Sequence, residues 1–383
     1  MPKLAPGFNP SCGASTASGF YARRVRPPPE GVRERVSLAS CCTFELGGPA
    51  RWLLEVRDES TLRAALEWSH ATNTPTFVLG GGSNVVIDDA GFDGLVLHMA
   101  LRGIDARVEG SRMLVHAAAG EPWDDFVAHT VSHEWAGLEC LSGIPGLVGA
   151  TPIQNVGAYG QDVSETIVSV RVFDPDTMLA RDITPAMCAF GYRDSAFKHR
   201  AHSLSRCIVT SVTFALTPHG PPAVKYPELA RALGEASPTL AHVRERVIAL
   251  RRAKSMVRDP RDENRRSAGS FFTNVLLSPA DADALTARAH ALGFGDVPRF
   301  GGGEGRVKIP SAWLIERAGF TKGQRWGAIG ISSRHALSLV HHGGGSSAEL
   351  MAVAESIVKR VRDVFGVGLE VEPVRLRATR GDE

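Results

Sequence analysis

The sequence predicts an α+β protein of two or three domains. A chain of 383 residues is longer than most single domains. Short apolar runs such as 76–79 read as strands and are interspersed with stretches of helical periodicity such as 240–254. Two uncharged, glycine-rich segments stand among these elements, and the sequence changes character after the Pro- and Gly-rich run 217–222, where we place a domain boundary.

Composition excludes several function classes. The net charge is +2, from 43 basic and 41 acidic residues, so no overall field attracts nucleic acid or a membrane, and we expect neither as a partner. The six cysteines are scattered and form no C-x-x-C pair, which predicts neither a metal site nor a disulfide framework. Reduced thiols indicate a cytoplasmic protein.

The chain divides into four predicted parts. Residues 1–37 are expected to be a disordered N-terminal extension, because they hold no apolar run typical of a secretory signal and end near a stiff run of prolines. An organelle transit peptide is the alternative for this basic, acid-poor segment. Residues 38–218 form a first module with subdomains 38–100 and 101–218, residues 219–376 a C-terminal domain, and residues 377–383 a tail.

The first module contains mostly strands. Asp58 or Ser60 can cap a helix that runs through Asn73, and Pro122 opens a second helix that ends near His133. The expected strands cover residues 50–56, 76–79, 85–87, 95–99, 113–118, 167–173, 179–183 and 206–216, with a turn at 91–94.

The C-terminal part is richer in helix. Helices are expected at 227–233, 240–254, 279–292 and 310–318. Ser346 and Glu349 form a capping box at the start of the last long helix, and Gly366 ends it. A closing strand over 368–376 places Glu370 and Glu372 on one face.

The central candidate for function is the uncharged segment 141–160. It contains five glycines, but its prolines, Gln154 and Asn155 argue against a membrane span. Glycine lets the backbone approach a ligand closely, so that its N–H groups become hydrogen-bond donors. The second such segment, Gly80 to Asn84, makes an ordinary connector less plausible. Neither segment matches a dinucleotide-binding or P-loop motif, but two glycine loops together suit a long diphosphate such as FAD.

Two polar segments add candidate catalytic groups. Arg193, in the run 191–198, suits a substrate carboxylate or enolate, and the alternative is a local pair with Asp194. Ser270 follows a glycine and precedes two phenylalanines, which places a hydroxyl beside an apolar wall. Its alternative is a helix N-cap, since no esterase motif surrounds it.

Together these segments resemble one family, the UDP-N-acetylenolpyruvoylglucosamine reductases, also called UDP-N-acetylmuramate dehydrogenases. The likeness runs from Leu38 to Leu376, and Tyr192 to Lys198 with Tyr226 is similar to the subgroup with a tyrosine-bearing substrate loop. Its marks are Thr43-Phe44-x-x-Gly47-Gly48-Pro49-Ala50, 80–84, 143–160, 192–198, 269–272 and Glu372.

The resemblance implies a fold and a reaction. The fold is a two-subdomain FAD-binding module of the PCMH/VAO type with a C-terminal α+β domain that closes over a UDP-sugar. NADPH reduces FAD, and hydride passes from flavin N5 to UDP-N-acetylglucosamine enolpyruvate, giving UDP-N-acetylmuramate for peptidoglycan synthesis. The expected enzyme is monomeric. No histidine lies between His70 and His98, so we expect the FAD to be non-covalent.

The resemblance also implies roles for residues. Arg193 holds the substrate carboxylate, Ser270 gives the proton to the α-carbon, and Glu372 is the carboxylate of the same catalytic cluster. The substrate-binding residues are Tyr192, Tyr226, Lys254 and Asn274. The cofactor-binding residues are Gly80, Gly81, Gly82, Ser83, Asn84, Gly143, Ile144, Pro145, Gly146, Gly149, Ala150, Thr151, Gln154, Asn155, Gly157, Ala158, Tyr159, Gly160 and Arg251.

The chain departs from the family pattern at three places. Val275 follows Asn274 where a proline is expected, and Glu370 could replace Glu372 if the last strand is shifted by one repeat. The loop between Lys254 and Ser270 is longer and more highly charged, which we expect to affect closure over the substrate. The alternative functions are a flavin-dependent alcohol or sugar oxidase, a paralogue acting on a related UDP-sugar, and a non-catalytic binding protein.

Overall fold

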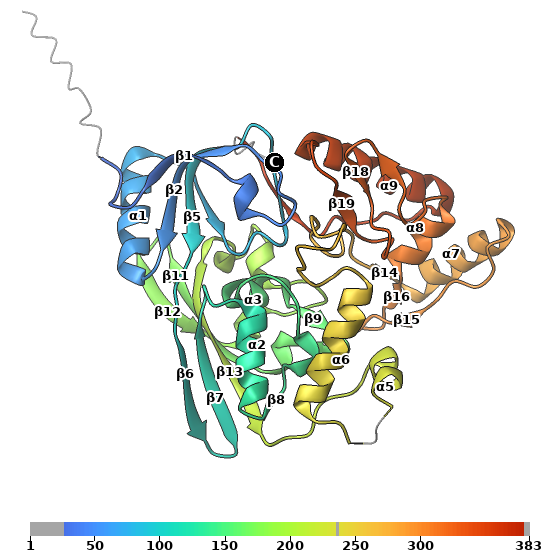
Figure 1. Ribbon diagram of the computed structural model, residues 1–383, viewed down its shortest axis with the longest axis horizontal. Coiled ribbons are helices and arrows are strands. Elements are labelled where there is room, and N and C mark those ends of the chain that lie inside the picture. Colours follow the sequence, from blue (N-terminus) through green and yellow to red (C-terminus); the bar gives the residue numbers. More distant parts are fainter. Residues whose placement is uncertain (1–26, 235–236, 379–383) are drawn as a thin grey trace, which may run out of the picture.

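The computed structural model describes residues 27–234 and 237–378 (Figure 1). The expected extension therefore lies outside the described residues up to position 26, as does the tail beyond 378. Residues 33–37 are not part of a disordered extension, because they form strand β1 (Arg33–Ser37), which pairs antiparallel with β2 (Pro49–Val56). This short edge strand is mostly exposed and lacks an apolar alternation that would have revealed it.

The first subdomain is a mixed sheet with one helix. The strand order is β1-β2-β5-β3, in which β2, β3 (Thr76–Leu79) and β5 (Phe92–Met99) run parallel. β5 begins three residues earlier than expected, within the predicted turn. Helix α1 (Glu59–Thr72) begins as predicted, because the Asp58 carboxylate accepts a hydrogen bond from the Thr61 N–H at 2.7 Å.

The second subdomain is built on a larger antiparallel sheet. The strands follow the order β12-β11-β13-β7-β6, and β8 pairs with the end of β13. Trp123 and Phe126 of α2 (Trp123–Ser132) pack against Phe214 of β13. Pro122 is the N-cap of α2 rather than its first helical residue. The strand bounds are β6 (Ile104–Glu109), β7 (Arg112–Ala118), β8 (Trp135–Ala136), β11 (Ile167–Asp174), β12 (Leu179–Ile183) and β13 (Ile208–Pro218).

Short elements lie within the central glycine segment and after it. They are α3 (Thr151–Gln154), the hairpin of β9 (Gly157–Ala158) with β10 (Gln161–Asp162), and α4 (Pro185–Cys188). Asn155 ends α3 in the left-handed conformation, with φ of 40°.

Helices α5 (Pro227–Leu233) and α6 (Leu240–Ala253) have the predicted positions but pack differently from the predicted division of domains. Their apolar faces share a cluster with Cys140, which belongs to the second subdomain. Arg244 of α6 also binds Asp124 of α2, and the two helices lie side by side in Figure 1. The structure therefore attaches residues 227–253 to the second subdomain.

The C-terminal domain combines two small sheets with three helices. The sheets have the orders β14-β16-β15 and β17-β18-β19. Helix α9 (Ser347–Phe365) has the predicted capping box, in which Ser346 accepts from the Glu349 N–H at 3.1 Å and Glu349 accepts from the Ser346 N–H at 2.8 Å. The other bounds are β14 (Val275–Leu277), α7 (Pro279–Ala291), β15 (Phe300–Gly301), β16 (Val307–Ile309), α8 (Ser311–Arg317), β17 (Arg325–Trp326), β18 (Ile329–Ile331) and β19 (Leu339–His341).

The closing strand is shorter than predicted. Only β20 (Val374–Leu376) is a strand, and it pairs parallel with β4 (Val85–Ile87) of the first subdomain. Before it, Val371 forms an isolated bridge to Phe272. Pro373 has no N–H to donate and separates the two pairings, so Glu370 and Glu372 do not lie on one continuous strand.

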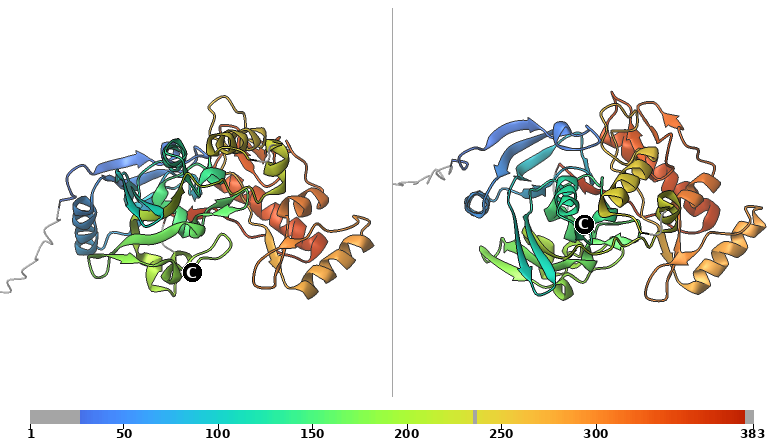
Figure 2. Two further views of the ribbon diagram at one scale, coloured as in Figure 1. Left: turned by 90° about the horizontal axis from the view of Figure 1, so that it is seen from below. Right: turned by 60° about the horizontal axis from the view of Figure 1, so that its bottom comes forward.

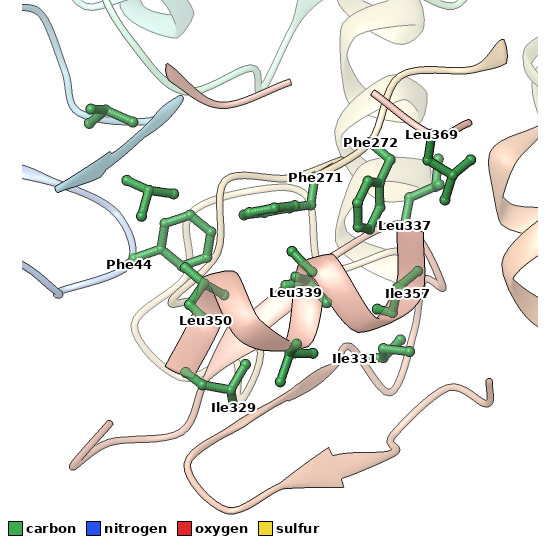
Figure 3. Close-up of a cluster of buried hydrophobic side chains, with 14 of the residues drawn as sticks. Phe44, Phe271, Phe272, Ile329, Ile331, Leu337, Leu339, Leu350, Ile357 and Leu369 are labelled. Atoms are coloured by element: carbon green, nitrogen blue, oxygen red, sulfur yellow. The ribbon is translucent and has the colours of Figure 1, made fainter. Parts of the chain in front are cut away.

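The C-terminal domain and the first subdomain share one apolar core. Phe44 meets Phe271 edge to face, with ring centroids 6.0 Å apart, and Leu350 of α9 lies beside them (Figure 3). A second cluster joins the first subdomain to the second through side chains such as Leu66 and Phe173. The two further views in Figure 2 show the C-terminal domain beside the first two subdomains. Helices and strands occur in all three parts, so the mixed α+β fold class predicted from the sequence is confirmed. Among the described residues, no helix combines the length and apolar character needed to span a bilayer.

Candidate active site

The two glycine loops face each other at close range. Ser83 of the first loop donates to the carbonyl of Pro145 at 3.3 Å. A Cβ at Gly81 would lie 3.0 Å from the Gly146 Cα, and one at Gly82, whose φ is 62°, would lie 1.9 Å from the Cys41 carbonyl oxygen. A side chain at Gly81 would therefore press on the Gly146 backbone, and glycine is required at Gly82, where the first loop passes Cys41.

These loops form one side of a cleft with about 1130 Å³ of empty space, part of it open to solvent. The predicted site residues that line the cleft are Ser83, Asn84, Ile144, Pro145, Gly146, Ala150, Thr151, Gln154, Gly157, Arg193, Arg251, Ser270 and Glu372. The predicted cofactor residues that do not line it are Gly80, Gly81, Gly82, Gly143, Gly149, Asn155, Ala158, Tyr159 and Gly160. Several of these support the wall from behind, as Gly149 does against Ala119.

Two of the described residues that line the cleft have buried polar atoms without a hydrogen-bond partner. Within the described part of the chain, Oε1 of Gln154 and Nε of Arg251 are buried and have no hydrogen-bond partner. Burial lowers the pKa of Arg251 to about 10, and its Nη2 donates to the Met256 carbonyl at 2.8 Å. Buried polar atoms are rarely left unpaired. An uncharged glycine cradle with unsatisfied donors and acceptors fits a phosphate-bearing, polar cofactor such as FAD.

Arg193 lies on a tight turn that directs its guanidinium into the cleft. Gly191 and Asp194 exchange backbone hydrogen bonds at 2.9 and 3.3 Å, and Arg193 between them has a left-handed φ of 53°. The guanidinium donates to the carbonyls of Asn155, at 3.3 Å, and Gly157. Asp194 instead binds His199 at 2.8 Å, so the alternative of a local Arg193–Asp194 pair is wrong.

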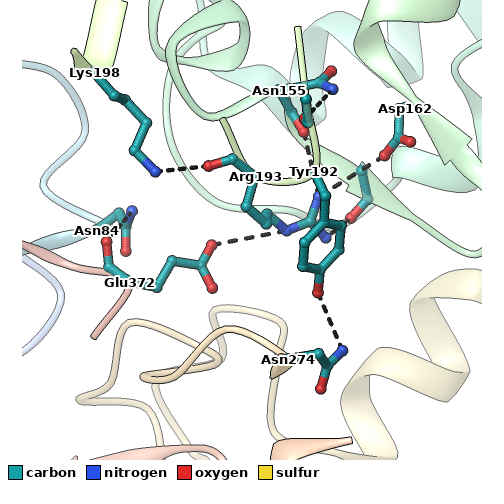
Figure 4. Close-up of polar contacts among 10 residues, drawn as sticks. Asn84, Asn155, Asp162, Tyr192, Arg193, Lys198, Asn274 and Glu372 are labelled. Atoms are coloured by element: carbon teal, nitrogen blue, oxygen red, sulfur yellow. Dashed lines mark hydrogen bonds and ion pairs between the residues drawn. The ribbon is translucent and has the colours of Figure 1, made fainter. Parts of the chain in front are cut away.

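Glu372 faces Arg193 from the C-terminal segment (Figure 4). Its Oε1 lies 3.8 Å from Arg193 Nε, and its backbone is fixed because its N–H donates to the Phe271 carbonyl at 3.0 Å. Burial raises the pKa of the Glu372 carboxyl, although Arg193 and Lys198 oppose the shift. Glu370 is exposed and does not line the cleft, so Glu372 is the one of these two carboxylates that lies beside Arg193. Asp162 Oδ1 also lies 3.9 Å from Arg193 Nη1 but does not line the cleft.

Ser270 enters the cleft from the C-terminal domain. The next two side chains, Phe271 and Phe272, are fully buried in the shared core and fix its position. No helix begins at Ser270, so the N-cap alternative is wrong. Within the described residues its hydroxyl makes no hydrogen bond, which leaves it available to a ligand.

The predicted substrate residues lie at two places beside the cleft rather than in its lining. Asn274 donates to the Tyr192 hydroxyl at 3.1 Å, which joins the C-terminal domain to the Arg193 turn. Lys254 binds Glu228 at 2.7 Å and lies 5.8 Å from the Tyr159 ring centroid. Tyr159 in turn meets Tyr226 edge to face at 5.6 Å. The structure thus groups Tyr159, predicted as a cofactor residue, with two predicted substrate residues.

Asp124 and Arg244 hold the second glycine loop in place, and the sequence analysis did not predict this role. The Asp124 carboxylate accepts from the Gly143 N–H at 2.6 Å and binds the Arg244 guanidinium at 2.5 and 3.0 Å. The bridge therefore fixes the start of the second glycine loop to α2 and α6. The two residues are 120 positions apart, and no local motif could have paired them.

Comparisons with known proteins agree with this geometry. Residues 50–181 match the model of an FAD binding domain, and residues 259–376 match that of the UDP-N-acetylenolpyruvoylglucosamine reductase C-terminal domain. The reductase of Thermobifida fusca is 44% identical over 351 residues, which cover 90% of this chain and 98% of that one. The Streptomyces coelicolor reductase is 47% identical over 344 residues and 88% of each chain.

A solved structure supports the same assignment. The crystal structure of the Thermus caldophilus UDP-N-acetylenolpyruvylglucosamine reductase superposes with a TM-score of 0.61 at 25% identity, covering 90% of this chain and all of that one. Sequence relatives, both domain models and the fold agree over nearly the whole described chain. The chain therefore belongs to the UDP-N-acetylenolpyruvoylglucosamine reductases, a family of FAD-dependent oxidoreductases.

Proposed function

We propose that this chain reduces UDP-N-acetylglucosamine enolpyruvate to UDP-N-acetylmuramate in peptidoglycan precursor synthesis, with NADPH as the reductant. The observation that carries the proposal is the meeting of Arg193, Ser270 and Glu372 at one cleft beside the glycine cradle. These residues come from three distant segments, and each supplies a group that the reduction of an enolpyruvyl ether requires. We also propose that the enzyme is a cytoplasmic monomer.

The cradle residues hold the cofactor and the three cleft residues serve the substrate. Bound FAD supplies the hydride that reaches the methylene carbon of the enolpyruvyl group. Gln154 and Arg251 would bind it through their unpaired buried atoms, and the glycine loops through backbone N–H groups. Tyr192, Asn274, Lys254 and Tyr226 lie beside the cleft, where they would hold the nucleotide-sugar portion.

Arg193 and Glu372 control the charge that develops during the reaction. Negative charge grows on the α-carbon and its carboxylate, and a guanidinium can bind a carboxylate through two parallel hydrogen bonds. Arg193 is already fixed by two backbone carbonyls, so little reorganisation is needed when the charge appears. Burial raises the pKa of Glu372, which makes its protonation beside the substrate anion easier than that of an exposed glutamate.

Ser270 provides the proton that completes the reduction. A serine hydroxyl is a weak acid, so it protonates only a strongly basic centre such as the developing α-carbanion. Its hydroxyl has no competing partner in the described residues and lines the same cleft as Arg193. The proton therefore reaches the α-carbon from the wall formed by the C-terminal domain.

Anaerobic absorbance of the flavin band tests the proposed function. One equivalent of NADPH should bleach the band, and UDP-N-acetylglucosamine enolpyruvate should then restore it. Bleaching without recovery would move the substrate to a different compound, and absence of a flavin band would refute the cofactor assignment. Denaturation should release all the colour, whereas flavin that stays attached to the chain would favour an oxidase with covalent FAD.

A further inference from the structure

The lining of the cleft carries more positive charge than the catalytic groups need. Its charged residues within the described chain are four arginines, at 193, 251, 258 and 265, and one carboxylate, Glu372. Arg193 faces Glu372, and Arg251 is buried beside the glycine cradle. Arg258 and Arg265 remain, and neither the catalytic cluster nor the cradle accounts for them.

Arg258 and Arg265 are unpaired, unlike their neighbours. Arg261 on the same loop binds Asp259 at 3.1 Å, and Arg266 forms an ion pair with Glu45. In the ranges that the structure describes, the guanidinium groups of Arg258 and Arg265 have no ion pair and no hydrogen bond, although Asp259, Asp262 and Glu263 are close in sequence. The loop thus pairs some of its arginines and directs two others into the cleft lining.

The loop that carries these arginines is firmly anchored. Asn264 is 1% exposed, and its side chain donates to the Ser333 hydroxyl at 3.0 Å and accepts from the Ser333 N–H at 3.1 Å. At the other end, the N–H of Met256 donates to the Arg251 carbonyl at 2.9 Å. Arg258 and Arg265 each lie within two residues of an anchor, so their backbone positions are set before a ligand arrives.

We propose that Arg258 and Arg265 form an anion subsite at the wall of the cleft that binds phosphate groups of the exchangeable nucleotide ligands. The ligand is the reductant or the UDP-sugar, and this inference rests on the proposed function. Guanidinium groups bind phosphate oxygens through paired, charge-assisted hydrogen bonds. We assign FAD to the glycine loops rather than to this subsite, although Arg258 and Arg265 line the same cleft as those loops. The subsite sets affinity for the ligands that enter and leave during each turnover.

The experiment uses rapid anaerobic mixing of the FAD-loaded enzyme. The double variant Arg258→Ala/Arg265→Ala is compared with wild type and with Arg252→Ala, an exposed arginine on α6 that does not line the cleft and has no ion pair in the described chain. Half-saturating concentrations are measured for NADPH and NADH in flavin reduction, and for UDP-N-acetylglucosamine enolpyruvate in flavin reoxidation.

We expect the double variant to raise at least one of these concentrations about tenfold relative to Arg252→Ala. If only the half-saturating concentration of NADPH rises, the subsite binds the 2′-phosphate of NADPH. If the values for NADPH and NADH rise equally, it binds their diphosphate. If the value for the enolpyruvate rises, it binds the diphosphate of UDP. The pair Arg258→Lys/Arg265→Lys should have an intermediate affinity, because an ammonium still attracts phosphate but cannot form the paired hydrogen bonds of a guanidinium.

Two results would overturn the inference. One is a double variant that matches Arg252→Ala for all three ligands, and the other is a change in FAD affinity alone. Neither arginine has a partner to lose, so thermal unfolding of the variants should match that of wild type. If wild-type flavin is not reoxidised by the enolpyruvate, the proposed function fails instead, and the two failures are therefore distinguishable.

Discussion

Replacing Asp124 with alanine should weaken FAD binding more than removal of a similar ion pair that does not contact the glycine loops. The Asp124 carboxylate holds the Gly143 N–H at 2.6 Å and the Arg244 guanidinium at 2.5 and 3.0 Å. Without it, the first amide of the second glycine loop and a partly buried arginine both lose their partner. The loop would then have to be ordered by FAD itself.

The contacts give the size of the effect. The side chains of Arg244 and Asp124 are 19% and 36% exposed, so we assign their pair about 1 kcal/mol. The bond from the Gly143 N–H to a charged acceptor contributes about 1.5 to 2 kcal/mol. Only this second part holds the loop in the cofactor-binding conformation. Its loss corresponds to a rise of roughly 10- to 30-fold in the Kd for FAD.

The assay is titration of the apoprotein with FAD, followed by flavin fluorescence, beside thermal unfolding. Glu59→Ala is the matched control, because Glu59 binds Arg171 through both oxygens at 2.8 and 3.3 Å and does not line the cleft. Both variants should lose similar stability, while only Asp124→Ala raises the Kd. An equal rise in both variants, or none in Asp124→Ala, would refute the reasoning.

Three further predictions concern the catalytic cluster. Ser270→Ala should leave flavin reduction by NADPH intact and abolish reoxidation by the enolpyruvate; equal slowing of both half-reactions would contradict its role as proton donor. Arg193→Lys should lower turnover at least about 100-fold, since an ammonium cannot form the two parallel bonds to a carboxylate; near-normal turnover would make Arg193 structural. Glu372→Gln should be more stable than wild type at pH 8 and equally stable near pH 4. Burial raises the folded pKa of Glu372, so wild type loses stability as pH rises from the unfolded value of about 4.3 through that raised pKa. A Tm difference that does not change between these pH values would show that the carboxyl is not destabilised by burial.

Local signals in the sequence predicted the local structure well. The capping box at Ser346 is a pattern of four residues, and it fixes the start of α9 without help from distant contacts. Gly366 and Asn73 end their helices in the left-handed conformation, which is likewise a property of the local residues and needs no distant contact. The glycine loops were also recognisable from their clustered glycines, and a side chain at Gly81 would press on the Gly146 backbone.

Features that depend on distant partners were not predictable. Strand β1 is exposed and charged, and only pairing with β2 makes it a strand. The apolar faces of α5 and α6 were visible, but nothing in them indicated that they cover Cys140 rather than the C-terminal domain. The pairing of Asp194 with His199, which frees Arg193 for the cleft, likewise depends on the folded turn.

The arrangement of the apolar cores has a consequence for how ligands enter. The first subdomain shares one core with the C-terminal domain and another with the second subdomain. The contacts between the second subdomain and the C-terminal domain at the cleft are polar, and include the 3.1 Å bond from Asn274 to Tyr192 and the 3.8 Å pair of Arg193 with Glu372. Water can replace polar contacts at far lower cost than it can enter an apolar core. The polar seam between the second subdomain and the C-terminal domain is therefore the boundary at which separation would cost least, while the shared apolar cores hold both parts to the first subdomain.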